Sequence, residues 1–314
     1  MKQLTYWHAN LRNANKTLLW SGSDNEEDWL KIVEQSKTNY LNESQKKDLE
    51  HYMKNPIEYK LNNYGFRTYD DLDSSEGNVY LGCSFTYGEG HHLENTWSYK
   101  LHKLIGNKLK YYNLAQPATG IDFAFRMLYS YGNIIKPKNV FLYIPFPRRF
   151  EHPVKFNKYD NLTNEIFYNP YHIVAPTFST NFLTGTDNMN SVEQIELLKN
   201  QMYALTRDEH IEMSYVKNYW SIQRLCEDMG ANFYCINPFH DELQNVEDDK
   251  SIVPNKARDS HPSVSYQNSL FSLFYEQYSN NKKPEVYDFS KHTWKIRRTE
   301  IEQFWFKTPI KTTI

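Results

Sequence analysis

The sequence predicts a three-layer α/β/α sandwich around a mostly parallel sheet. Four short apolar runs have the length of buried strands, and helix-like segments separate and follow them. Such an alternation implies right-handed crossovers and helices on both faces of the sheet. The expected strands are residues 78–81, 110–114, 140–144 and 232–236, and the expected helices are residues 96–105, 122–131, 191–205, 215–229 and 265–278.

Glycine and proline support several of these bounds. Gly82 ends the first apolar run, and Pro145 stops the third, which opens at Pro137. Gly230 is a natural C-cap for the helix expected before the fourth strand.

We expect the 314 residues to form one enlarged α/β domain with an N-terminal segment, a mid-chain insertion and a C-terminal tail. The N-terminal segment is expected to hold two helices, at residues 26–35 and 43–53, and the stretch from Arg148 to Met189 is expected to be loop. The expected parts are residues 1–76, an N-terminal extension or cover; residues 77–280, the α/β domain with an insertion at about 150–214; and residues 281–314, a C-terminal tail.

Composition excludes several classes of protein. The net charge is −2, with 36 basic and 38 acidic residues, so no basic field exists to bind nucleic acid. The 3 cysteines are too few and too scattered for a disulfide framework or a zinc site. The N-terminus lacks a signal-peptide pattern, and no window reaches the roughly 18 apolar residues of a membrane span. We therefore expect a protein of the cytoplasm or of a virion, with no membrane partner.

Ser84 is the first candidate for chemistry. It follows the first expected strand by three residues, and loops at the carboxyl ends of parallel strands collect reactive groups. A serine hydroxyl becomes a useful nucleophile when a base removes its proton and donors stabilise the oxyanion. Gly82 permits a tight turn before the serine, and Gly88 and Gly90 free the loop after it. Alone, Gly-X-Ser is also typical of an ordinary turn or helix cap.

The residues around Ser84 strongly resemble the first signature block of SGNH/GDSL hydrolases. Residues 78–90 read Asn-Val-Tyr-Leu-Gly-Cys-Ser-Phe-Thr-Tyr-Gly-Glu-Gly, where the family has a strand, Gly-Asp-Ser and then Phe-Thr-X-Gly. The resemblance implies a flavodoxin-like sheet and makes Ser84 the nucleophile. Cys83 stands where the family has aspartate, which leaves an oxidisable thiol beside the site.

A second block is similar to the family's Asn-X-X-X-X-Gly loop. Residues 113–120 read Asn-Leu-Ala-Gln-Pro-Ala-Thr-Gly and follow an expected strand. The resemblance makes the backbone N–H groups of Ser84 and Ala118 the oxyanion donors, with Gly120 as the alternative to Ala118.

The third block departs from the family. The expected strand runs into Pro-Phe-Pro-Arg-Arg at residues 145–149, which puts Pro147 where the family has an oxyanion-binding asparagine. Proline has no N–H and no side-chain donor. Arg148 or Arg149 could supply a donor to the oxyanion or to the substrate; both could equally lie on a solvated loop or pair with Glu151. Third blocks of this Pro-Arg-Arg type are expected in tailed-phage genomes.

A closing block resembles the family's Asp-X-X-His-Pro segment. Residues 257–263 read Ala-Arg-Asp-Ser-His-Pro-Ser and precede the last expected helix. The resemblance makes His261 the general base and Asp259 the group that orients its imidazole. The Asp-X-His spacing is one residue shorter than usual, as in related acyltransferases that act on bacterial exopolysaccharides.

These blocks predict a serine esterase that removes a small, acetyl-like acyl group from a carbohydrate or another polar ester, with no cofactor and no metal. The alternatives are an O-acyltransferase with the same triad, and a catalytically weak module that binds glycan or protein. His91 and His92 with Glu94 read as loop residues rather than as a metal site. The rings of the insertion, including Phe156, could pack internally or stack on sugar.

Overall fold

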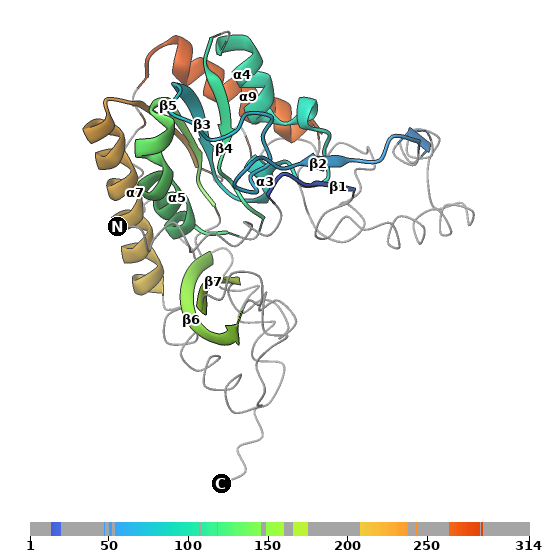
Figure 1. Cartoon of the computed structure of the whole chain (residues 1–314). Helices are drawn as coiled ribbons and strands as arrows, with labels where there is room; N and C mark the ends of the chain where they lie inside the picture. Colours follow the sequence, from blue (N-terminus) through green and yellow to red (C-terminus); the bar gives the residue numbers. More distant parts are fainter. Residues whose placement is uncertain are drawn as a thin grey trace, which may run out of the picture.

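The computed structural model describes part of the chain (Figure 1). Side chains are described for residues 14–19, 54–106, 108–117, 119–145, 213–237 and 264–282, and for residues 47, 50, 51, 243 and 284; backbone alone is described for residues 149–159, 166–174 and 208–212.

A parallel four-stranded sheet forms the centre of the domain. Its strands are β3 (Gly77–Leu81), β4 (Lys110–Asn113), β5 (Pro137–Tyr143) and β8 (Asn232–Ile236), in the order β4-β3-β5-β8. All three neighbouring pairs are parallel. This is the flavodoxin-like order, in which the first strand pairs with the second on one side and with the third on the other. The predicted fold class is confirmed.

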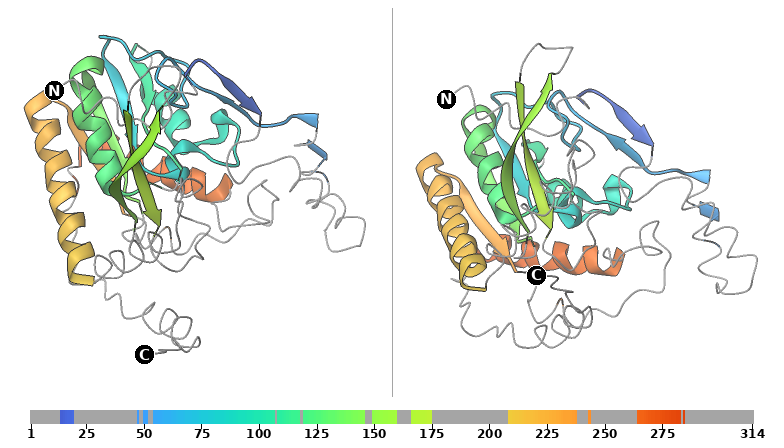
Figure 2. Two further views of the ribbon diagram at one scale, coloured as in Figure 1. Left: turned by 60° about the horizontal axis from the view of Figure 1, so that its bottom comes forward. Right: turned by 90° about the horizontal axis from the view of Figure 1, so that it is seen from below.

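Helices cover both faces of this sheet (Figures 1 and 2). Side chains alternate along each strand, so Val79, Leu81 and Val140 join one core, and Tyr80 and Phe141 join the other. The first core is closed by α5 (Ile121–Ile135) and α7 (Asp208–Met229), and the second by α4 (Trp97–Ile105) and α9 (Val264–Ser279).

Most predicted elements lie where the sequence pattern put them. The four strands agree with the expected ranges to within three residues at either end, and residues 232–236 agree fully. Gly230 does cap α7: its φ is +67°, and the Gly230 and Ala231 N–H groups bond the carbonyls of Glu227 and Cys226. This is the Schellman pattern. The expected helices at residues 26–35 and 191–205 lie outside the described residues.

The loop expected from Arg148 to Met189 was wrong in part. Backbone strands β6 (Arg149–Tyr159) and β7 (Ile166–Val174) pair antiparallel there, beside α5 (Figure 2). Pro153 and Pro170 lie directly opposite each other in this pair. Both strands of a two-stranded sheet are edge strands, so a proline is tolerated where its missing N–H faces away from the partner.

The segment before β3 packs into the domain. Its strand β2 (Glu58–Lys60) pairs with β1 (Thr17–Leu19), and Phe66 and Leu72 belong to the core under α5. The segment expected as a cover therefore supplies core residues.

No described helix of the chain is long and apolar enough to cross a bilayer.

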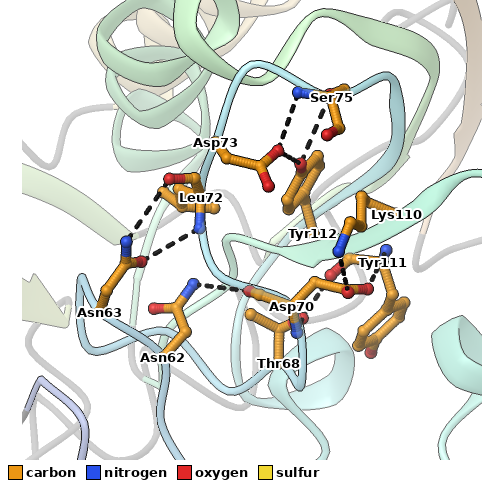
Figure 3. Close-up of polar contacts among 10 residues, drawn as sticks. All are labelled: Asn62, Asn63, Thr68, Asp70, Leu72, Asp73, Ser75, Lys110, Tyr111 and Tyr112. Atoms are coloured by element: carbon orange, nitrogen blue, oxygen red, sulfur yellow. Dashed lines mark hydrogen bonds and ion pairs between the residues drawn. The ribbon is translucent and has the colours of Figure 1, made fainter.

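Side chains of this segment also protect the edge of the sheet at β4 (Figure 3). Asp70 accepts the backbone N–H of Tyr111 at 2.8 Å and pairs with Lys110 at 2.9 Å. Thr68 donates its hydroxyl to the Tyr111 carbonyl, and Asp73 accepts the Tyr112 hydroxyl at 3.0 Å. The two bonds at Tyr111 occupy backbone groups that another strand would otherwise use, which blocks edge-to-edge pairing there.

An asparagine ladder crosses the other three strands of the sheet near their amino ends. Asn78, Asn139 and Asn232 are in register on β3, β5 and β8. Asn232 donates to Asn139 at 3.0 Å, and Asn139 donates to Asn78 at 2.8 Å. The Asn78 amide nitrogen lies 3.4 Å from His102 Nδ1 on α4. The ladder satisfies polar groups inside the layer that aromatic rings otherwise fill.

His102 makes the stability of the domain depend on pH. Burial lowers the pKa of His102 from 6.5 to about 4, although the Asp70 carboxylate opposes this shift. The unfolded chain therefore takes up a proton between pH 6.5 and 4 that the folded chain does not. We expect the free energy of unfolding to fall by about 2 kcal/mol as the pH drops through that window. Urea unfolding of wild type and of His102→Gln across this range checks it, since the variant should show a shallower pH dependence.

Candidate active site around Ser84

Ser84 lies in a tight turn at the carboxyl edge of the sheet. It is the first residue of the one-turn helix α3 (Ser84–Tyr87), three residues after the end of β3, and it is 2% exposed. Gly82 has a φ of +151°, and a Cβ there would overlap Thr86 Oγ1 and approach the Tyr143 carbonyl. Glycine is therefore strongly favoured at this position, where the sequence predicted a glycine that permits a tight turn.

The turn lies at the point where the order of the strands reverses. After β3 the chain continues to β4 on one side of β3, and β5 then lies on the other side of β3. Ligands of open α/β sheets bind in the crevice outside the carboxyl ends of the strands at such a point. The position of Ser84 is thus a consequence of the sheet order.

Three buried side chains bond the backbone carbonyls that follow Ser84; we call Arg67, Asn113 and Gln267 the carbonyl clamp. Gln267 Nε2 donates to the Phe85 carbonyl at 3.1 Å, and Asn113 Nδ2 donates to the Thr86 carbonyl at 2.9 Å. Arg67 Nη1 donates to the carbonyls of residues 87 and 88. The final carbonyls of a helix have no partner inside it. The clamp supplies those partners from three separate parts of the chain.

Arg67 is the charged member of the clamp and is 1% exposed. Its guanidinium lies 4.1 Å from the centroid of the Tyr59 ring, and its Nη2 donates to the His91 carbonyl at 2.7 Å. Carbonyl oxygens and a ring face are the groups that offset the desolvation of a buried guanidinium. Arg67 therefore holds the turn that runs from Tyr87 to His91.

The second predicted loop lies against the serine turn. Thr119 Oγ1 bonds the Gly82 carbonyl at 3.1 Å and the Gln116 carbonyl at 2.8 Å. Gly120 follows as the N-cap of α5, with an extended backbone at φ −101°. This bond ties the loop of the candidate oxyanion donor to the residue two places before Ser84. Ala118, the other candidate donor, lies outside the described residues.

The third and closing blocks are described only at their margins. β5 ends at Tyr143, and the Ile144 N–H bonds the Ile236 carbonyl at 3.0 Å. Pro147 and Arg148 lie outside the described residues, and only the backbone of Arg149 is described, at the start of β6. Asp259 and His261 also lie outside the described residues, and α9 begins at residue 264.

The start of α9 packs directly on the serine helix. The Tyr266 ring meets the Phe85 ring edge-on with centroids 5.7 Å apart, and the Tyr266 and Tyr143 hydroxyls are 2.9 Å apart. Burial raises the pKa of both tyrosines above the usual value, so their hydroxyls are neutral. Cys83, the N-cap residue of α3, is fully buried in the same core.

The described residues around the turn contain no metal site. No group of three or more His, Cys, Asp or Glu side chains among them is arranged to hold an ion. Burial, as the main cause, lowers the pKa of His92, which lies half-buried near Glu94.

Sequence reasoning missed Arg67, Thr119 and Gln267. Each bonds a backbone carbonyl far away in the chain, and such a bond leaves no spacing pattern in the sequence. Asn113 was noted only as the start of the second block.

Comparisons with known proteins give remote likenesses. No protein-family model matches the chain, and no curated protein matches it. The crystal structure of TesA is 12% identical over 65% of this chain and 98% of that chain, with a TM-score of 0.32. A protein described as lipolytic and of the G-D-S-L family, from Desulfitobacterium hafniense DCB-2, is 10% identical over 63% and 97%, with a TM-score of 0.26.

Gly82→Ala tests how strictly the turn is defined. The added methyl group meets Thr86 Oγ1, and the positive φ is unfavourable for alanine. We expect a loss of about 2–4 kcal/mol in the free energy of unfolding, measured with urea. Gly230→Ala is the control: it also has a positive φ, of +67°, but a Cβ there meets nothing within 4 Å, so we expect a loss of about 1 kcal/mol. Equal losses in the two variants would contradict the steric argument at Gly82.

Proposed function

We propose that the chain is a serine esterase of SGNH type. In this proposal Ser84 Oγ attacks the carbonyl carbon of an ester while His261 takes the proton of the Ser84 hydroxyl. The oxyanion accepts hydrogen bonds from the backbone N–H of Ser84 and from that of Ala118 or Gly120. Collapse of the tetrahedral intermediate expels the alcohol, which receives the proton from His261. His261 then activates a water that releases the acid and restores Ser84. Asp259 orients the imidazole and stabilises its charged form.

The position of Ser84 carries the proposal. It opens the first helix after the first strand of the sheet, at the point where the strand order reverses, and it follows a glycine whose positive φ and close contacts disfavour any side chain. Most serines in turns have neither this place in an α/β sheet nor a clamp of buried side chains behind them. This placement supports the nucleophile that the first signature block led us to expect.

Two neighbouring contacts support the roles of the other residues. The bond from Thr119 to the Gly82 carbonyl brings the loop of the second oxyanion donor to the serine turn. Gln267, six residues after His261 in the chain, bonds the residue that follows Ser84. The described partners in these two bonds, Thr119 and Gln267, are close in the sequence to the proposed donor and the proposed base, and this supports the proposed roles.

We further propose a polar substrate with a small acyl group, such as an acetylated carbohydrate. The expectation comes from the sequence, in which Phe, Tyr, Asn and Thr are mixed through the insertion that contains β6 and β7. Aromatic rings stack on sugar faces, and amides bond hydroxyls. Arg148 and Arg149 are the proposed replacement for the missing asparagine donor at Pro147.

Labelling with a fluorophosphonate probe tests the nucleophile and the base. Wild type should be labelled, and Ser84→Ala should not be labelled at all. His261→Ala should be labelled at least about 10³-fold more slowly, because the serine would lose its base. Circular dichroism on each variant controls for folding. A folded wild type that is not labelled would contradict the esterase and favour the module that binds glycan or protein.

Arg148→Gln and Arg149→Gln, measured separately with p-nitrophenyl acetate, test the proposed replacement for the asparagine. Loss of an oxyanion donor lowers kcat by about 10²–10³-fold with little change in KM. We expect one of the two variants to show this loss, and the other to serve as its control. If both retain wild-type kcat, the oxyanion is stabilised without either arginine.

A further inference from the structure

The carbonyl clamp joins the two ends of the proposed active site. Gln267 and the carbonyl that it bonds, on Phe85, are 182 residues apart in the sequence. Its side-chain oxygen also accepts the N–H of Trp97, the first residue of α4, at 2.8 Å. A single amide therefore connects α3, α4 and α9.

We propose that Gln267 is a positioning residue for the reaction of Ser84. It acts by fixing the one-turn helix that carries Ser84 against the first turn of α9. This inference rests on the proposed function, because it assigns Gln267 a role in the reactivity of Ser84 and not only in stability.

The geometry leaves the Gln267 amide one orientation. The side chain is fully buried. Its oxygen accepts a hydrogen bond from the Trp97 N–H, and its nitrogen donates one to the Phe85 carbonyl. An amide flipped by 180° would lose both bonds. Since both partners are backbone groups at helix ends, the amide sets the distance between those two helices.

The residues on either side of Gln267 hold the same turn of α9. The Tyr266 and Tyr143 hydroxyl oxygens are 2.9 Å apart. Asn268 Oδ1 accepts a hydrogen bond from Lys100 Nζ at 2.7 Å. Three successive residues thus anchor α9 on β5, α3 and α4. His261 lies outside the described residues and precedes Tyr266 by five residues in the sequence, which is why we connect this anchored turn with the proposed base.

Gln277 offers a matched control within the same helix. Its side-chain oxygen accepts the Cys235 N–H at 3.2 Å, and its nitrogen donates to the Cys235 carbonyl at 3.0 Å. It therefore makes the same pair of bonds as Gln267, but to β8. The two positions are ten residues apart, which is about 15 Å along the helix axis.

The first experiment compares Gln267→Met with Gln277→Met in the full-length chain. Methionine keeps the length of the side chain and removes both bonds. The rate of fluorophosphonate labelling of Ser84 is measured where urea unfolding shows each variant to be fully folded. We expect labelling to slow by about 10-fold or more in Gln267→Met. In Gln277→Met, distant from the serine turn, it should slow by less than about 2-fold.

A second variant covers the case in which Gln267→Met does not fold. Gln267→Asn retains an amide but is one methylene shorter, so it cannot reach Trp97 and Phe85 together. It should also slow labelling, and the pH dependence of the labelling rate should flatten because the base is no longer held at one distance. A folded Gln267 variant that labels as fast as the Gln277 variant would overturn the proposal and leave the esterase standing.

Thiol cross-linking separates the failure of this proposal from the failure of the esterase. Cysteines replace Ser84 and His261 in a chain that also carries Cys83→Ala, a short bis-maleimide joins them, since a direct disulfide cannot span a serine–histidine pair, and mass spectrometry follows the cross-link. The cross-link should form, more slowly with Gln267→Met and at an unchanged rate with Gln277→Met. This result would support the positioning role even if wild type is not labelled. That role would be overturned if no cross-link formed, or if Gln267→Met left the rate of cross-linking unchanged.

Discussion

The carbonyl groups of α3 need hydrogen-bond partners that a helix of four residues cannot supply. In this structure the carbonyls of residues 85, 86 and 87 accept hydrogen bonds from the side chains of Gln267, Asn113 and Arg67, which come from three separate parts of the chain. The Ser84 carbonyl accepts hydrogen bonds from the backbone N–H groups of Gly88 and Glu89. Buried carbonyls without partners would cost about 1–3 kcal/mol each, so the turn keeps its shape only when the whole domain has folded. The orientation of Ser84 is thereby coupled to global stability.

The sheet supplies the frame for that clamp. Tyr80, Phe141 and Tyr234 form a row of stacked rings across β3, β5 and β8, with centroids 5.3 Å and 4.9 Å apart along the row. The asparagine ladder crosses the same three strands nearer their amino ends. Together the two rows fix the strand register. A fixed register is what puts the ends of β3 and β5 side by side, where the serine turn begins.

The fold was largely predictable because its signals are local. Apolar runs of five residues, a C-capping glycine and a proline at the start of a strand each act within one turn or one strand. The hairpin of β6 and β7 was missed since Pro153 and Pro170 argue against strands, and only their pairing makes them acceptable. Arg67 and Gln267 were missed for a related reason. Their partners are backbone carbonyls, which every residue carries, so nothing in the sequence marks the pairing.

What the sequence determined by itself is the order of strands and helices, the glycine turn before Ser84 and the cap at Gly230, because periodicity and backbone conformation are properties of short segments. The tertiary structure decided the order of strands in the sheet and which side chains meet at the serine turn. Those outcomes depend on bonds between residues as far apart as Phe85 and Gln267. Such bonds form only when packing brings distant segments together, and no local pattern encodes which segments meet.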